Sequence, residues 1–286
     1  MNRPKRRIKY KALWILAAVL LLCAGLALFF RWQQTGIQTE EISLSDARLP
    51  AAFDGLRIAL VSDVHSARFG PDNEALLQAV EGLKPDLIAL TGDLVDCYRA
   101  DISMVEPLAR GLAGIAPTYY VTGNHEWALG SSVVRDLKQT LSDCGVTVLS
   151  NEYLTLEREG QALVLAGIDD PNGFADQKTL AQLMTEIRSN LGNPFVLLLA
   201  HRNNDCPLYA RCGVDVTLCG HGHGGIIRLP FTDGLLSVDR TLFPDHTAGL
   251  YQLDYGQLVV SRGLGNSGST FRLFNRPHLP VVVLHS

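Results

Sequence analysis

The sequence has no excess of positive charge, and this excludes one large class of partner. It contains 25 Lys and Arg against 29 Asp and Glu, for a net charge of -4 at pH 7. Because nucleic-acid-binding surfaces are normally basic, no nucleic-acid partner is expected. Low-complexity tracts and internal repeats are also missing. With 47% hydrophobic and 19% charged residues among 286, the composition is typical of a globular protein with one large or two small domains.

Cysteine pairs at metal-binding or redox spacing are absent as well. Of the six cysteines, none forms a C-x-x-C pair, and Cys23 lies in an apolar segment. The remaining odd number argues against a disulfide framework or a structural zinc site. A Cys206–Cys212 disulfide is the alternative, but buried thiols are the expectation for these residues.

Charge is missing altogether from one long stretch near the N-terminus, Ala12 to Phe30, which holds 19 residues. At about 1.5 Å per helical residue this run can cross a hydrocarbon core of about 30 Å. Six basic residues precede it, so the positive-inside rule places the N-terminus in the cytoplasm and the remaining chain outside. We therefore expect a single-pass cell-membrane protein with an extracytoplasmic domain. The predicted parts are a basic N-terminus (1–11), a transmembrane anchor (12–31), a linker (32–41) and a catalytic domain (42–286).

Two alternatives to an anchor remain for this apolar run. Gly25 and Ala27 are small residues at the spacing of a signal-peptide cleavage site. However, the run is longer than a typical signal core and continues into Phe29 and Phe30, which favours an uncleaved anchor. A buried core helix is disfavoured because the run is apolar on all sides and has a basic flank.

The rest of the chain alternates between apolar runs and amphipathic stretches. This order predicts a sheet built from crossover units. The intervals Asp63 to Asp93 and Asp93 to Asn124 are each about one βαβ unit of ~30 residues. We expect one α/β domain with two sheets sandwiched between helices. The expected strands span 42–44, 56–61, 86–90, 118–121, 146–149, 153–156, 163–166, 195–200, 214–218, 248–253, 257–261 and 281–284, and the expected helices span 71–83, 102–112, 131–144 and 177–191.

Polar clusters follow the apolar runs of the predicted sheets. The clusters are Asp63-x-His65, Gly92-Asp93, Gly123-Asn124-His125-Glu126, His201 and the glycine-rich Gly220-His221-Gly222-His223. Open α/β sheets bind ligands at the carboxyl ends of their strands, so these clusters should meet at one edge. Asp and Asn also favour ordinary turns, which would explain one cluster but not all of them.

This mixture of nitrogen and oxygen ligands suits a binuclear metal site. Two divalent ions about 3.5–4 Å apart share a bridging carboxylate in such sites. Asp93, in the middle cluster, is the candidate bridge. A ligand set without thiolate suits Mn, Fe or Zn.

The order D-x-H, G-D, G-N-H-E, H, G-H-x-H resembles the calcineurin-like metallophosphoesterase superfamily. Further segments, 227–230, 261–265 and Arg276-Pro277, are similar to the bacterial membrane-anchored or exported, YkuE-like branch. The resemblance covers nearly all of the chain after the apolar run. The fold it leads us to expect is a four-layer α/β/β/α sandwich of two mixed sheets, preceded by one transmembrane helix.

The resemblance also implies roles for individual residues. One divalent metal ion would be held by Asp63, His65, Asp93 and His223, and the other by Asp93, Asn124, His201 and His221. His125 would stay unliganded and protonate the leaving oxygen or bind the phosphate. Asp96 would orient His125, and a carboxylate placed there favours the acid form of the imidazole. A metal-bridging hydroxide would attack phosphorus.

Several residues outside this set have open interpretations. Position 126 is Glu where the branch more often has Asp, and little effect is expected. The branch often has a proline after the histidine at 201, and its absence from Arg202–Asp205 would alter only the pocket wall. Asp169-Asp170 is interpreted as a turn, with the pocket rim as an alternative. Arg228 and Arg262 are either phosphate clamps or solvated arginines, and His246, His278 and His285 are interpreted as structural.

The expected activity is that of a metal-dependent phosphoesterase, with a phosphodiester in the cell envelope favoured. A phosphomonoesterase is the alternative within enzymes. A catalytically silent, membrane-anchored metal-binding scaffold is disfavoured because no expected ligand is missing. Location alone suggests a phospholipid, a teichoic-acid-type polymer or a lipid-linked nucleotide as substrate, and a monomer is expected.

Overall fold

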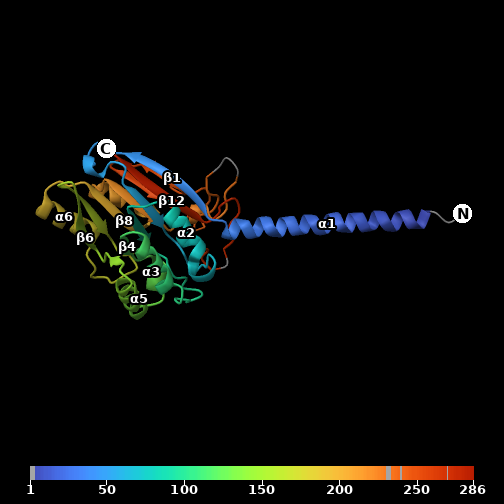
Figure 1. Ribbon diagram of the computed structural model, residues 1–286. Coiled ribbons are helices and arrows are strands. Elements are labelled where there is room, and N and C mark those ends of the chain that lie inside the picture. The colour runs from blue at the N-terminus through green and yellow to red at the C-terminus, as the bar shows by residue number, and fades with distance from the viewer. Residues whose placement is uncertain (1–3, 230–232, 239, 269) are drawn as a thin grey trace.

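Runs of Val, Ile and Leu assemble into two six-stranded sheets in the computed structural model (Figure 1). The structure describes residues 4–229, 233–238, 240–268 and 270–286. The first sheet has the order β1-β12-β2-β3-β4-β5 and the second has the order β10-β11-β9-β8-β7-β6. The strands are β1 (Gln38–Ser45), β2 (Arg57–Val61), β3 (Leu87–Thr91), β4 (Thr118–Val121), β5 (Thr147–Val148), β6 (Glu152–Arg158), β7 (Gln161–Gly167), β8 (Val196–Arg202), β9 (Val216–Gly220), β10 (Gly249–Gln252), β11 (Gln257–Val260) and β12 (His278–His285).

Both sheets are mixed, with a parallel centre that positions the polar clusters. Strands β2, β3, β4 and β5 run parallel, while β12 pairs antiparallel with β2 and parallel with β1. In the second sheet β7, β8, β9 and β11 run parallel, and β6 and β10 are antiparallel edge strands. The predicted strand–helix–strand order is confirmed, and parallel strands bring their carboxyl ends to one edge.

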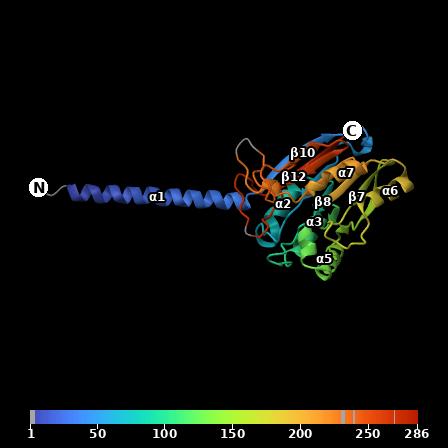
Figure 2. The same cartoon turned by 180° about the vertical axis from the view of Figure 1, so that it is seen from behind.

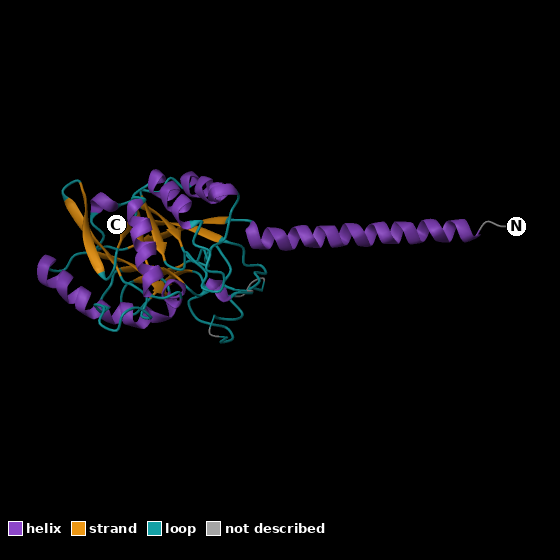
Figure 3. Cartoon of the chain, turned by 90° about the horizontal axis from the view of Figure 1, so that it is seen from below, coloured by secondary structure: helices purple, strands orange, loops and turns teal. Residues whose placement is uncertain are grey.

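Helices cover the outer face of each sheet, which gives the expected four layers (Figure 3). Alternation along β2 shows the arrangement: Val61 packs with the helix layer, whereas Leu60 packs between the sheets. Three buried clusters therefore separate the four layers, and α6 and α7 pack on the second sheet. The α-helices are α1 (Pro4–Thr35), α2 (Glu74–Gly82), α3 (Val105–Ile115), α4 (Asn124–Ala128), α5 (Ser131–Asp143), α6 (Leu180–Leu191) and α7 (Cys206–Cys212).

Several helix boundaries differ from the prediction for local reasons. The first helix expected at residue 71 begins as a 3-10 turn, Pro71–Asn73, and becomes α2 only at Glu74. α3 begins three residues late because Asp101 accepts a hydrogen bond from the backbone N–H of Ser103, forming a turn first. α6 begins after Thr179, whose side chain accepts from the N–H of Gln182 in a capping box.

The expected linker at 32–41 is wrong as a separate segment. α1 continues to Thr35, and β1 begins at Gln38 as an edge strand of the first sheet. α1 extends away from the domain as one long helix (Figures 1 and 2), and its span Tyr10–Thr35 is long and apolar enough to cross a membrane. The helix is compatible with an anchor or a signal sequence.

Candidate metal centre

The candidate ligands lie where parallel strands of both sheets end. Asp63 and Asp93 each follow the last residue of their strand, β2 and β3, by two positions. His201 lies near the end of β8, and His221 directly follows β9. Contacts between β3 and both β8 and β9 hold the sheets face to face, so the strand ends of the two sheets meet.

An unusual backbone accompanies this convergence. Left-handed φ angles, which favour glycine, occur at five of the seven candidate ligands: Asp63 (51°), His65 (48°), Asp93 (52°), His221 (67°) and His223 (47°). Such conformations cost energy in residues with a Cβ and persist where surrounding contacts fix them. Here the backbone N–H of His65 donates to the carbonyl of Asp93 at 2.9 Å, which joins the two loops.

One group of ligands consists of Asp63, His65 and His223, all buried. The Nε2 atoms of His65 and His223 lie 3.0 Å apart, and His223 Nε2 lies 3.8 Å from an Asp63 oxygen. Asp93 borders the group, with its Oδ2 3.6 Å from His65 Nε2. These are the four residues expected to hold one metal.

A second group consists of Asp93, His201 and His221, with Asn124 beside them. His201 Nε2 lies 3.2 Å from Asp93 Oδ2 and 3.0 Å from the Asn124 side-chain oxygen. His221 Nδ1 is 3.1 Å from the same His201 atom. The structure thus brings together all seven expected ligands as two groups that share Asp93.

The spacing of these atoms fits divalent cations. Bonds of about 2.1 Å to neighbouring octahedral ligands separate the ligand atoms by about 3.0 Å. The measured separations of 3.0–3.8 Å within the two groups match this requirement. The donor set of imidazoles, carboxylates and one amide therefore fits two cations of the Mn, Fe or Zn type.

The protonation states within the site favour metal binding. Burial lowers the pKa of His65 and of His221 far below 6.5 and lowers that of His223 to about 4, so these imidazoles keep a free lone pair at neutral pH. Burial opposes the charge on Asp93 and on His201, but their mutual attraction lowers the pKa of Asp93 and raises that of His201 to about 10. A bound cation would replace that proton as the partner of both groups.

His201 is also oriented from behind. Its Nδ1 lies 2.8 Å from the Thr91 carbonyl oxygen, to which it donates, so Nε2 faces Asp93. A hydrogen bond of this kind fixes the tautomer and the ring direction of a metal-ligating histidine.

His125 lies beside both groups, as expected, with its Nε2 4.0 Å from Asp93 Oδ2 and 3.3 Å from Ser267 Oγ. Asp96 Oδ1 lies 3.5 Å from His125 Nδ1, which accepts a hydrogen bond from the N–H of Cys97. The fully buried Asp96 carboxylate is bonded to Arg99 Nε at 2.9 Å. Asp96 is therefore next to His125 but is not its direct hydrogen-bond partner.

Glu126 has a larger structural role than the sequence suggested. Its buried carboxylate accepts hydrogen bonds from the backbone N–H groups of Asp93 (3.0 Å), Val95 (3.2 Å) and Gly123 (2.7 Å). Burial, and then the nearby Asp93 carboxylate, raise the pKa of Glu126 to about 7, so positive charge in the site would favour its ionised form. Glu126 therefore joins the loops of two candidate ligands. The sequence signal for this role was the G-N-H-E motif, in which Glu126 occupies the N3 position of a helix that begins after Gly123.

Arg272 was missed altogether by sequence reasoning. Its guanidinium is buried, donates to the carbonyls of Arg262 and Gly265, and lies 3.4 Å from His223 Nδ1. Burial lowers its pKa to about 10, which leaves it charged. No local pattern marks Arg272, because it lies in an irregular loop and its contact with the site, His223, comes from another segment.

The interpretation of Asp169-Asp170 as a turn is confirmed, because the Asp170 carbonyl accepts a hydrogen bond from the N–H of Gly173 at 2.9 Å, but these residues do more than form a turn. Both side chains are buried: Asp169 accepts from Thr122 Oγ1 and Lys138 Nζ, each at 2.7 Å. Asp170 forms a two-pronged ion pair with Arg202, from Nε at 2.7 Å and Nη2 at 3.1 Å. The pair braces the end of β8 next to His201.

The remaining open residues have structural surroundings. Arg228 donates to the Gly224 carbonyl, and the Arg262 side chain packs against Gly224, so neither is a freely solvated arginine. His278 pairs with Glu40, and His246 packs on Tyr251. His285 contacts Asp54, and all six cysteines are free.

Comparison with known proteins gives a consistent result. A family model described as calcineurin-like phosphoesterase matches residues 56–225, which include every candidate ligand. The chain is 29% identical to the uncharacterized metallophosphoesterase YkuE of Bacillus subtilis, over all of this chain and 99% of that protein. It is also 29% identical to the phosphodiesterase YaeI of Escherichia coli, over 80% and 82% of the two chains. A putative 5'-nucleotidase structure from Staphylococcus aureus aligns with a TM-score of 0.48 at 14% identity, covering 72% of this chain and 49% of that one.

Proposed function

Because this chain belongs to the calcineurin-like phosphoesterase family, we propose that it hydrolyses a phosphodiester with the help of two divalent cations. The observation that carries the proposal is the position of Asp93. Its Oδ2 lies 3.2 Å from His201 and 3.6 Å from His65, which belong to different ligand groups. One carboxylate thus connects both groups, as a bridging ligand must.

The chain's own residues supply the remaining parts of the reaction. Bound divalent cations polarise a phosphoryl oxygen and lower the pKa of water. His125 Nε2 faces the same Asp93 oxygen at 4.0 Å and would give its proton to the departing alkoxide. The two cations would be bound, together with Asp93, by the remaining candidate ligands, which are Asp63, His65, Asn124, His201, His221 and His223. Glu126 fixes the loops of Asp93 and Asn124 through hydrogen bonds to the backbone N–H groups of Asp93 and Gly123.

A diester is preferred over a monoester because YaeI, a relative over most of this chain, is named a phosphodiesterase. The phosphomonoesterase alternative uses the same ligands. A silent scaffold would be expected to have lost a ligand or His125, and all of them are present. The basic residues before the uncharged run of α1 support a domain outside the cytoplasmic membrane, anchored by α1.

The activity is tested with full-length protein in detergent and added Mn²⁺. We expect turnover of bis(p-nitrophenyl) phosphate to exceed that of p-nitrophenyl phosphate. Asp93→Asn should lose both turnover and bound metal, whereas Asp136→Asn, on the exposed face of α5, serves as the matched control. Metal-loaded protein that turns over neither ester, or an Asp93→Asn variant with unchanged metal content, would contradict the proposal.

The orientation has its own test. Protease added to spheroplasts should digest the domain and leave a fragment protected by the membrane. A domain that is digested only after lysis would place it in the cytoplasm.

A further inference from the structure

The domain end of α1 packs directly on the loop that supports the metal centre. The rings of Phe29 and Phe274 lie 6.0 Å apart, and those of Phe30 and Phe271 lie 5.5 Å apart. The Gln34 side chain hydrogen-bonds to both the backbone carbonyl and the backbone N–H of Arg272. α1 is therefore connected, through one residue, to a guanidinium that touches His223.

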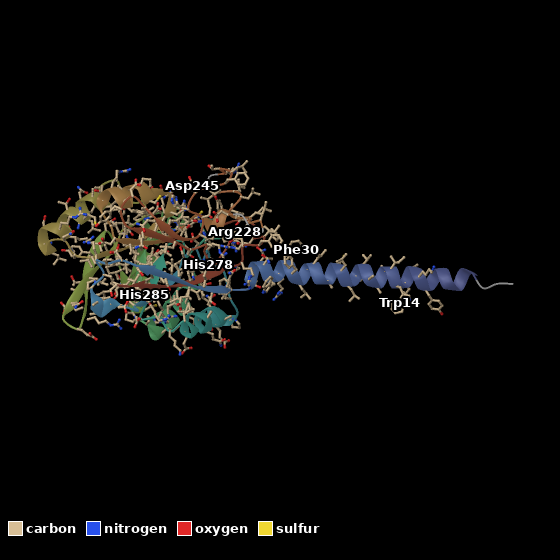
Figure 4. The ribbon with its side chains drawn as sticks, turned by 90° about the horizontal axis from the view of Figure 1, so that it is seen from above. Trp14, Phe30, Arg228, Asp245, His278 and His285 are labelled. Atoms are coloured by element: carbon tan, nitrogen blue, oxygen red, sulfur yellow. The ribbon has the colours of Figure 1, made fainter. Side chains whose placement is uncertain are left out.

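The rest of α1 points away from the domain. Figure 4 shows Trp14 far out on the helix and Phe30 at the edge of the domain. Burial on the domain begins at Phe29, and Gln33 is the first fully buried residue among those described. With α1 across a bilayer, the membrane surface would therefore lie near Phe29 to Trp32, and the loops around this point would face the lipid.

These loops carry exposed apolar side chains. The described parts of one loop are 226–229, 233–238 and 240–247, those of the other are 262–268 and 270–277, and a bridge between Ile227 and Leu273 joins the two loops. These parts lie around the domain end of α1 (Figures 1 and 2). The exposed apolar residues of this lipid-facing surface include Leu242, Phe243, Phe271 and Phe274. Large apolar side chains grouped at one end of a domain mark an interaction site for protein or membrane.

The sequence of the same two loops contains five arginines, of which Arg272 is buried, and three aspartates. Arg228, Arg262 and Arg276 lie close enough to influence one another, and Glu40 is the acid within this group. Asp233 pairs with Arg228. The enclosed Nε and Nη2 of Arg262 have no hydrogen-bond acceptor among the described residues. Arginine at a membrane surface attracts anionic headgroups.

A cavity of about 670 Å³ lies between residues of the same two loops and borders the metal centre. It reaches His223 and Ser267 at its inner end, beside His125. Its lining combines apolar with basic side chains: Ile226, Leu236, Val238, Arg99 and Arg240. A cavity of this mixed character suits a molecule with a charged head and an apolar tail.

We propose that the substrate is the phosphodiester of an anionic glycerophospholipid, presented by the bilayer that holds α1. This proposal rests on the proposed function and names its substrate class. The oxygen of water joins phosphorus, one P–O ester bond breaks, and the departing alcohol takes a proton. The products are a phosphomonoester and an alcohol, one of which stays in the membrane.

The test compares two forms of the same headgroup. Full-length protein is reconstituted into vesicles of phosphatidylethanolamine and phosphatidylglycerol, and hydrolysis of phosphatidylglycerol is measured. Parallel assays use glycerophosphoglycerol, which lacks the acyl chains, and bis(p-nitrophenyl) phosphate. We expect kcat/KM for the vesicle lipid to exceed that for glycerophosphoglycerol by about tenfold or more, because the apolar part adds binding energy.

Leu242→Asp should lower the ratio of vesicle-lipid turnover to bis(p-nitrophenyl) phosphate turnover by about tenfold. Leu242 is 63% exposed, and Leu191, 45% exposed on α6 at the other end of the domain, provides the matched Leu191→Asp control. Phe243→Asp is a second, independent variant of the same surface. The control should keep the wild-type ratio.

The outcomes separate the two proposals. Turnover of the soluble diester without turnover of phosphatidylglycerol would overturn the lipid proposal and leave the phosphodiesterase proposal standing. Equal kcat/KM for phosphatidylglycerol and glycerophosphoglycerol, or equal losses in Leu242→Asp and Leu191→Asp, would also overturn it. Metal-loaded protein inactive on every ester would overturn both.

Discussion

Breaking the buried Arg202–Asp170 pair should cost far more stability than breaking an exposed pair of the same type. Asp170 is fully buried as a side chain, and Arg202 is its two-pronged partner at 2.7 and 3.1 Å. Arg202→Met leaves a carboxylate in the interior without its counter-charge. Losing one partner of a buried pair costs about 3–5 kcal/mol, and the partial exposure of Arg202 places the expected loss at about 3 kcal/mol. For a domain of this size that corresponds to a fall in Tm of roughly 6–12 °C.

Circular dichroism of full-length protein in detergent measures this loss. Arg110→Met is the matched control, because Arg110 bonds to Glu106 through two nitrogens but both side chains are more than half exposed. That variant should lose far less stability than Arg202→Met, because water screens an exposed ion pair. Asp170→Asn combined with Arg202→Met removes the uncompensated charge and should recover part of the Tm. An Arg202→Met variant no less stable than Arg110→Met would refute the reasoning.

Three further predictions concern metal and pH. His221→Ala and His223→Ala should each reduce metal content, measured by elemental analysis, at different ligand groups, so the double variant should lose more metal than either alone; equal content in all three would contradict the assignment. Removing divalent cations with a chelator should lower the Tm. Where the free metal concentration had been 100 times its Kd, the loss in the free energy of unfolding is about 2.7 kcal/mol. An unchanged Tm would argue against metal in the folded protein. Burial lowers the pKa of His278 to about 4 in the folded protein, whereas its value in the unfolded chain is near 6.5. The unfolded chain therefore binds the proton first as the pH falls. The contribution of His278 to the free energy of unfolding, at most about 3 kcal/mol, is complete above pH 6.5 and is lost as the pH falls toward 4. His278→Gln should flatten the Tm-against-pH curve in that window, and a curve unchanged from wild type would show that His278 does not contribute.

The spacing of the polar clusters was enough to predict the first half of the site. Asp63, Asp93 and Asn124 follow successive apolar runs at intervals of one βαβ unit, and chain connectivity then requires neighbouring parallel strands. The position of His201 and His221 opposite them did not follow in the same way. They belong to the second sheet, and only the face-to-face packing of β3 on β8 and β9 brings them near Asp93. Resemblance to a known family supplied that step.

The contacts that sequence reasoning missed share one property: they join residues that are distant in the chain. Asp170 was recognised only as part of a turn, because its pairing with Arg202 joins two different strand ends. Arg272 lies in a loop without periodicity, and its contact with His223 depends on how that loop folds back. Local sequence patterns predict which residues face a core, but they do not predict which loops contact one another.

The pairing of β1 with β12 has a consequence for the order in which the molecule is completed. β1 directly follows α1, and among the described strands its ladder partner is β12, near the other end of the chain. During synthesis β1 is made early, and it cannot pair with β12 until the ribosome has made nearly all of the chain. Contacts of such wide sequence separation form slowly. The β1–β12 ladder therefore forms late in assembly, and a chain shortened before β12 would lack this attachment of β1.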